Sequence, residues 1–272
     1  MPPLYPKMRG RPPEFRINRN SPLYDGLMFA GLGFLPNTPI FFDSSQYCNH
    51  GLFTGNVAWK WDVVLSRYVT YHTDDRSYIQ CRRGYAEADC WTWMVWATRS
   101  PSAAQLFAEA VGSVGIGEYS DDDMPQYWWV NSDGTSGYAR SRGRTWPSEG
   151  WFLYCGVFYA GVVCGYLSNR GFLTTQLLRG TWPTRLAASN AVKLGYNCAG
   201  AVLGDRLAWN RVLALSEIRE LDDPTNVDLR VGGVPLILPP RRRFWPVAPV
   251  AEAVFLKRRN LGLRAGSREA VI

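Results

Sequence analysis

Glu87 and Asp89 are the two acidic residues whose spacing in this 272-residue sequence best suits catalysis. In a strand their carboxyl groups lie on one face, where paired acids can act as general acid and nucleophile on a glycosidic bond. The third acid expected just beyond is absent, because Cys90, Trp91 and Thr92 stand there. No nucleophile elbow, phosphate loop or dinucleotide fingerprint is present either. We therefore expect the pair to be structural or solvated, and the chain not to be an enzyme.

Few residues in this sequence are candidates for metal ligands. The one calcium candidate is an acidic run, because calcium takes several hard oxygen ligands; it comprises Asp121, Asp122 and Asp123. Three adjacent carboxylates cannot all point inward, and the spaced Asp-x-Asp-x-Asp-Gly pattern of a dedicated calcium loop is absent. With only His50 and His72 in the chain, a histidine-based site is also disfavoured. We expect a solvated acidic loop, no metal and no cofactor.

The stretch "DSSQYCNHG" carries Asp43, Asn49 and His50, which could bind a ligand. A structural turn is the stronger prediction, because Asp and Asn side chains bond their own backbone in turns. Gly51 is then expected to adopt a positive φ.

Six cysteines occur without any Cys-x-x-Cys pair, which disfavours structural zinc. If Tyr159 and Ala160 form the tip of a hairpin, Cys155 and Cys164 lie directly opposite each other, close enough for a cross-strand disulfide. Buried free thiols are the alternative for a protein folded in the cytosol.

Adjacent tryptophans, Trp128 and Trp129, must face opposite sides of a strand. One of them is therefore a candidate for an exposed platform that stacks a sugar ring, or for the edge of an assembly interface.

Aromatic and β-branched segments separated by Gly, Asn, Asp, Ser and Pro predict an all-β fold. Helical periodicity is clear over residues 213–221, where four apolar residues share a face and Ser216 can cap; "SPSAAQLFAEAV" is a weaker helix candidate. The apolar run at residues 151–167 is too short to span a membrane and predicts a buried hairpin.

The stretch "GDRLAWNRVLALSEIRELDDP" resembles the end of laminin-G-like, concanavalin-A-like jelly rolls, where a last core strand runs into N-R-x-L-x-x-x-E-I. The matching residues are Gly204, Asp205, Trp209, Asn210, Arg211, Leu213, Ser216, Glu217 and Ile218. "DSSQYCNHG", "CWTWMVWA" and "WFLYCGVFYAGVVCGYLSNRG" resemble earlier family segments in the same order. The resemblance covers about residues 25–223 and implies a two-sheet antiparallel sandwich, with a short C-terminal helix over an open edge or end.

Both ends of the chain are basic and rich in proline. We predict an N-terminal arm over residues 1–24, the jelly-roll domain over 25–223 and an extended C-terminal arm over 224–272. The second arm carries cations that suit acidic protein surfaces and aromatics that add apolar contact: Arg241, Arg242, Arg243, Phe244 and Trp245. Nucleic acid is not an expected partner, because no recognised nucleic-acid motif accompanies the charges.

Long arms on a lectin-like domain predict an assembly component. "PPRRRFW" is similar to what laminin-G-like proteins of phages carry. The first hypothesis is a non-enzymatic bacteriophage virion protein, a decoration or accessory protein on capsid, neck or tail. It would contact other virion proteins as a homo-oligomer and also host surface glycans. A carbohydrate-binding tail-fibre adhesin is the alternative, and a polysaccharide-cleaving enzyme the third. Without a signal peptide, the chain is expected to be made in the host cytoplasm and to have no membrane partner.

Overall fold

The computed structural model describes residues 16–17, 19–32, 39–65, 67–98, 105–119, 124–141, 150–168, 171–222 and 230–231. The chain divides into two units, residues 1–236 and 237–272, and all described residues belong to the first. The anchoring residues predicted at 241–245 and the acidic run at 121–123 lie outside the described residues. Both therefore stay predictions.

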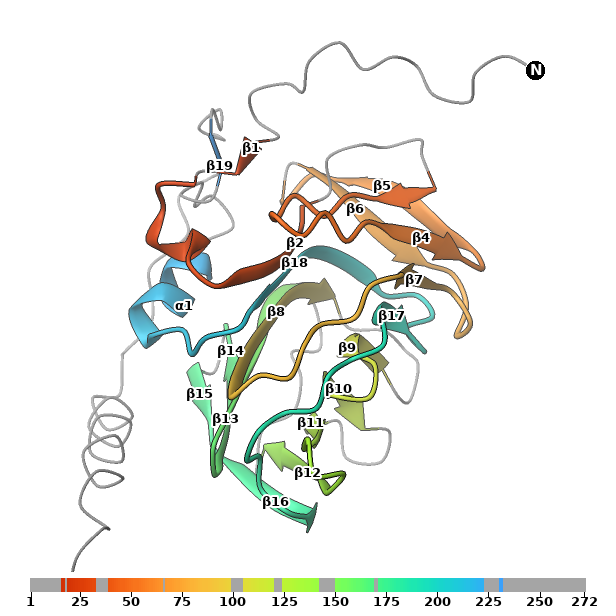
Figure 1. The fold of residues 1–272 in the computed structure, drawn as a ribbon. Helices are drawn as coiled ribbons and strands as arrows, with labels where there is room; N and C mark the ends of the chain where they lie inside the picture. Colours follow the sequence, from red (N-terminus) through yellow and green to blue (C-terminus); the bar gives the residue numbers. More distant parts are fainter. Residues whose placement is uncertain are drawn as a thin grey trace, which may run out of the picture. The chain divides into compact units, whose positions relative to one another are not determined.

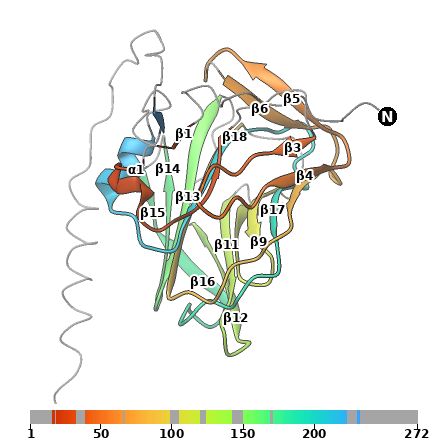
Figure 2. The same cartoon turned by 45° about the horizontal axis from the view of Figure 1, so that its top comes forward.

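The described residues form a jelly-roll sandwich of two antiparallel sheets, as the sequence predicted (Figures 1 and 2). The first sheet has nine strands in the order β16-β12-β11-β10-β9-β17-β7-β4-β3. Their bounds are Ile40–Phe41 (β3), Gly51–Thr54 (β4), Tyr78–Cys81 (β7), Gln105–Ala110 (β9), Val114–Tyr119 (β10), Met124–Val130 (β11), Ser136–Ser141 (β12), Thr175–Gly180 (β16) and Val192–Tyr196 (β17).

The second sheet has eight strands in the order β15-β14-β13-β8-β18-β6-β5, with β2 also paired to β18. Their bounds are Leu27–Gly31 (β2), Val57–Asp62 (β5), Arg67–His72 (β6), Cys90–Thr98 (β8), Trp151–Tyr159 (β13), Val162–Leu167 (β14), Gly171–Leu173 (β15) and Val202–Trp209 (β18). Outside these sheets, β1 (Arg16–Ile17) pairs with β19 (Arg230–Val231). A 3-10 helix, η2, spans Pro22–Tyr24, and the α-helix α1 spans Leu215–Leu221.

The main core lies between the two sheets and is rich in aromatic side chains. Trp91 and Trp93 stack at 5.9 Å in it, and Trp129 stacks on Trp182 at 6.1 Å. β11 shows the alternation that a sheet with one covered face requires, because every second residue is buried. β8 and β13 are buried at almost every position, since both of their faces are covered.

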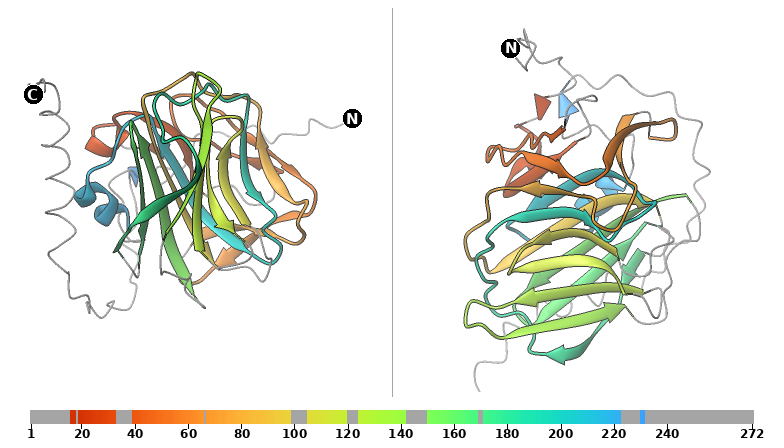
Figure 3. Two further views of the ribbon diagram at one scale, coloured as in Figure 1. Left: turned by 90° about the horizontal axis from the view of Figure 1, so that it is seen from below. Right: turned by 90° about the vertical axis from the view of Figure 1, so that its right-hand side faces the viewer.

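A second apolar cluster covers the outer face of the eight-stranded sheet. In this cluster η2 and α1 pack on side chains of β8, β13, β14 and β18. Three of its residues, Leu23, Trp209 and Ile218, are at most 1% exposed. Figure 3 (left) shows α1 outside this layer of the sandwich. The prediction of a helix over an open edge or end was wrong in this respect, because α1 covers a sheet face.

Two local helix predictions also need correction. Ser216 does not cap α1, whose N-cap is Ala214. The segment proposed as a weaker helix instead contains the strand β9, which pairs with both β10 and β17. Central sheet pairing outweighs the local helix preference of its alanines there. The hairpin predicted at residues 151–167 is confirmed as β13 and β14.

Candidate binding surface

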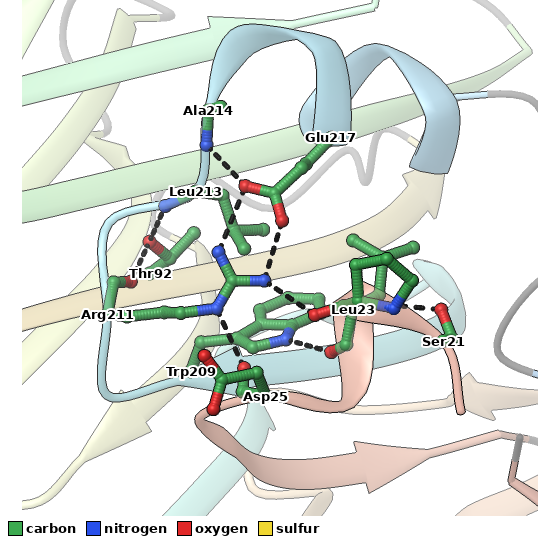
Figure 4. Close-up of polar contacts among 10 residues, drawn as sticks. Ser21, Leu23, Asp25, Thr92, Trp209, Arg211, Leu213, Ala214 and Glu217 are labelled. Carbon is green, nitrogen blue, oxygen red and sulfur yellow. Dashed lines mark hydrogen bonds and ion pairs between the residues drawn. The ribbon is translucent and has the colours of Figure 1, made fainter. Parts of the chain in front are cut away.

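The motif that carries the family resemblance fastens α1 to the domain (Figure 4). Arg211 forms a two-pronged ion pair with Glu217, at 2.6 Å and 2.9 Å, and its Nε donates to the carbonyl of Asp25 at 2.7 Å. Glu217 also accepts the backbone N–H of Ala214 at 2.7 Å. Burial opposes ionisation of Glu217, but the hydrogen bonds from Arg211 and Ala214 hold its pKa below the ordinary value. These residues are therefore structural.

The same region extends the packed domain toward the N-terminus. The indole N–H of Trp209 donates to the carbonyl of Leu23 at 2.7 Å, and Ser21 accepts the backbone N–H of Leu23. Leu23 is 1% exposed. Residues 21–24 thus pack with the sandwich, a few residues before the predicted boundary at residue 25.

The Asp43 turn is structural, as predicted. The Asp43 carboxylate is 1% exposed and accepts the backbone N–H groups of Ala30, Ser45 and Asn49, each at 2.8 Å. The predicted positive φ at Gly51 was wrong. Cys48 has that conformation, with φ of 47°, whereas Gly51 begins β4 at a point where a Cβ would lie 2.4 Å from Ile79.

Glu87 and Asp89 face Arg185 rather than a cleft. Arg185 Nε lies 3.2 Å from the Glu87 carboxylate and 4.0 Å from that of Asp89, and all three side chains are well exposed. Among the described residues no group of His, Cys, Asp and Glu side chains could hold a metal ion.

The hairpin register changes the predicted cysteine pairing. β13 and β14 turn at Ala160 and Gly161, so that Cys155 pairs with Tyr166 and Cys164 with Val157. The two cysteines are therefore diagonal rather than directly opposite, and neither forms a disulfide in the structure. The predicted geometry was wrong by two residues on one strand.

A buried polar cluster inside the sandwich was not anticipated from the sequence. Arg206 is fully buried, donates to Thr70 and lies 4.7 Å over the ring of Phe41, but its Nε and Nη1 have no hydrogen-bond partner in the described part of the chain. Burial lowers the pKa of Arg206 from 12.5 to about 9. Burial and the Arg206 charge lower the pKa of His72 from 6.5 to about 3. His72 is thus a neutral core residue.

The side chains of the two adjacent tryptophans point to opposite sides of β11, as strand alternation requires. Trp129 is 1% exposed, and its indole N–H donates to the carbonyl of Thr181 at 2.8 Å. Trp128 lies on the opposite side of β11 and is partly exposed. A Cβ on Gly115 would lie 2.0 Å from the Trp128 ring, so the indole lies across Gly115 on the neighbouring strand. The indole is thus packed against the neighbouring strand at Gly115.

Trp128 belongs to a transverse row of cross-strand partners, which point to the same face of a sheet. This face is the outer one, because the residues flanking the row on most of its strands are core residues. We name the row the outer row; in register from β4 to β16 it comprises Leu52, Gln80, Lys193, Glu109, Gly115, Trp128, Tyr138 and Arg179. Figure 3 (right) shows the sheet that carries it.

This face carries both charged and aromatic side chains. Lys193 Nζ lies 5.5 Å from the ring centroids of both Tyr78 and Tyr196. Burial raises the pKa of Glu109, an effect that neighbouring Lys193 partly counteracts. Beside Trp128, Arg140 Nε donates to Gln126 at 3.2 Å. An aromatic platform bordered by planar hydrogen-bonding side chains can stack one face of a sugar ring and bond its hydroxyls.

No protein-family model and no curated protein matches the sequence. The fold is similar to that of the botulinum neurotoxin DC binding domain solved in complex with SialylT, with 12% identity over 74% of this chain and 52% of that chain and a TM-score of 0.55. It is also similar to a botulinum neurotoxin type C structure from work on cell entry dependent on two ganglioside molecules. The identity is 13% over 75% of this chain and 53% of that chain, and the TM-score is 0.56. A third similar structure is the binding domain of Paraclostridial Mosquitocidal Protein 1, with 13% identity over 74% of this chain and 52% of that chain and a TM-score of 0.56.

These similarities establish the sandwich fold. This chain spans about half the length of the solved structures that it matches. No helix within the described ranges is long and apolar enough to cross a membrane.

Proposed function

We propose that this chain is a non-enzymatic, lectin-like binding domain, and that the outer face of the nine-stranded sheet binds glycans. One observation carries the proposal: α1 and η2 cover the outer face of the other sheet, whereas this face presents Trp128 packed against Gly115 with polar side chains beside it. A partly exposed indole packed against a strand is an apolar platform, and the polar neighbours supply directional contacts.

The structural neighbours support a binding role. The botulinum neurotoxin DC domain was solved with SialylT, and the type C structure comes from work on two ganglioside molecules. Glu87 and Asp89 support the absence of catalysis, since both lie exposed beside Arg185. Paired catalytic acids would instead face each other across a bound glycan at about 5–10 Å.

The proposed setting is a bacteriophage particle, with the chain made in the host cytoplasm. In that setting the domain decorates capsid, neck or tail as a homo-oligomer, and its arms bind other virion proteins. The basic, proline-rich composition of both ends supports anchoring. A tail-fibre adhesin is the alternative, and the partly exposed Trp128 favours it.

A glycan array carrying bacterial surface polysaccharides and sialylated glycans tests the binding proposal. The full chain should bind a subset of glycans, and Trp128→Ala should lose at least tenfold in affinity for that subset while remaining folded. Leu178→Ala is the matched control, because Leu178 is also an exposed apolar residue of the same sheet, on β16 at its edge. Equal binding by Trp128→Ala and the full chain contradicts the assignment of the site.

A chain that ends at Leu236 tests the setting, because it keeps the first unit and the β1–β19 pair intact. It should fold and keep its glycan binding but fail to enter particles in a phage-infected host. Normal incorporation contradicts anchoring by the C-terminal arm.

A further inference from the structure

The tip of the β5–β6 hairpin exposes apolar side chains that the proposed glycan surface does not use. Trp61, Val63 and Val64 are 52%, 76% and 53% exposed. They are the most exposed large apolar residues of the described chain. The hairpin ends the eight-stranded sheet, because β5 is its terminal strand (Figure 2).

The tip is held in place rather than left loose. Asp62 Oδ1 accepts the backbone N–H of Val64 at 2.9 Å and that of Leu65 at 2.8 Å, which fixes the turn. Leu65 is 1% exposed and anchors the end of the turn in the protein. On the neighbouring strand the ring of Tyr68 contacts that of Trp61 edge-on at 5.1 Å. An ordered turn therefore keeps the two valines in solvent.

We propose that this tip binds the interfacial region of a lipid bilayer with anionic headgroups. Trp61 suits that depth, because an indole combines an apolar body with one N–H donor and accumulates at membrane interfaces. Val63 and Val64 form the part that enters the acyl boundary. Exposed Lys60 lies next to Trp61 and can pair with an anionic headgroup.

A bilayer fits this surface better than a second protein. A stable protein interface buries about 800 Å² on each partner, which three side chains at a turn cannot supply. A bilayer surrounds a projecting turn and takes up each apolar side chain separately. This contact needs no membrane-spanning segment, but it departs from the sequence-based expectation of no membrane partner.

Vesicle co-sedimentation of the full chain tests the proposal. The chain should bind vesicles made of equal parts phosphatidylcholine and phosphatidylglycerol, and the double variant Val63→Asp, Val64→Asp should bind at least tenfold less. Leu178→Asp is the control, with the same type of substitution at one exposed apolar residue elsewhere, and should bind as the wild type does. Thermal unfolding of all three proteins checks that the tip variant is folded.

Salt distinguishes the tip from the basic arms. Charge-driven adsorption of the arms is screened at high salt, whereas the apolar part of the tip contact persists. The wild type should therefore retain binding at 0.5 M salt that the double variant lacks. Equal binding of wild type and double variant, no vesicle binding at all, or concentration-dependent self-association abolished by the double variant would each overturn the proposal.

Discussion

The two outer faces of this sandwich differ in how they meet solvent. The outer face of the eight-stranded sheet carries Met94, Trp96, Leu153 and Trp209 and is closed by α1 and η2. The outer face of the nine-stranded sheet carries the outer row, where Lys193 and Glu109 are cross-strand partners and the aromatic pair Trp128 and Tyr138 lies beyond Gly115. A face of uniform apolar character must be covered, whereas an aromatic face bordered by charge can stay in water. The first face therefore stabilises the domain, and the second carries the proposed glycan surface.

The largest expected effect comes from breaking the covered face. Ile218→Asp places a carboxylate at a position that is fully buried under α1, so it should lower the free energy of unfolding by more than about 4 kcal/mol. Leu178→Asp, on the exposed edge of the other sheet, should lower it by less than about 1 kcal/mol. Urea unfolding of both variants measures the difference, and similar losses would contradict the distinction between the two faces.

Removing the ion pair that fastens α1 should have a smaller effect. Arg211→Met leaves Glu217 without its main partner and frees the carbonyls of Asp25 and Pro22, which should cost about 2–3 kcal/mol. Arg185→Met removes an exposed contact with Glu87 and should cost at most about 0.5 kcal/mol. If the two substitutions cost the same, the resemblance motif does not fasten the helix.

Lowering the pH should reduce the stability of the domain through the buried core between the two sheets rather than through either outer face. Burial and Arg206 lower the pKa of His72 to about 3, while its unfolded value stays near 6.5. Between these values the unfolded chain holds more protons than the folded one, so stability falls as the pH drops below 6.5. The loss between pH 7 and pH 5 should be about 2 kcal/mol, from 1.36 kcal/mol per pH unit. Urea unfolding at both pH values measures it, and unchanged stability would show that His72 becomes protonated in the folded protein.

The smallest effect on stability should come from the open face. Gly115→Val pushes the Trp128 ring away from β10, but the ring can move into solvent, so the cost should stay within about 1 kcal/mol. Glycan binding should nevertheless fall as far as in Trp128→Ala, because the platform is displaced. Thermal unfolding and array binding of the same preparation test both halves. A strongly destabilised Gly115→Val with normal binding would reverse the roles assigned to the two faces.

The sequence predicted the sandwich well because alternation and turn residues are local signals. Trp128 and Trp129 had to face opposite sides, and only the buried flanking strands decide which of them lies outside. The Asp43 turn was also readable, since its hydrogen bonds lie close in sequence. The position of α1 was not, because its partners on β8, β13 and β14 are distant in the chain.

The candidate site was harder to predict from the sequence than the fold. The outer row joins eight strands whose order is not their order in the chain, so no sequence spacing brings Lys193 beside Glu109 or Tyr138 beside Arg179. Arg206 was missed for a similar reason. An arginine in a largely apolar strand gives the same sequence pattern whether it faces solvent or the core, and only the packing of Phe41 and Thr70 around Arg206 decides between the two.

Oxidative footprinting of the glycan-bound protein tests the central claim most directly. The full chain is exposed to hydroxyl radicals alone and with the strongest array ligand, and modification is quantified by residue. The account predicts protection of Trp128, Tyr138 and Tyr78 on the open face, with unchanged modification of Tyr24 and Leu221 beside the covered face. Protection at the covered face, with none at Trp128, would contradict it.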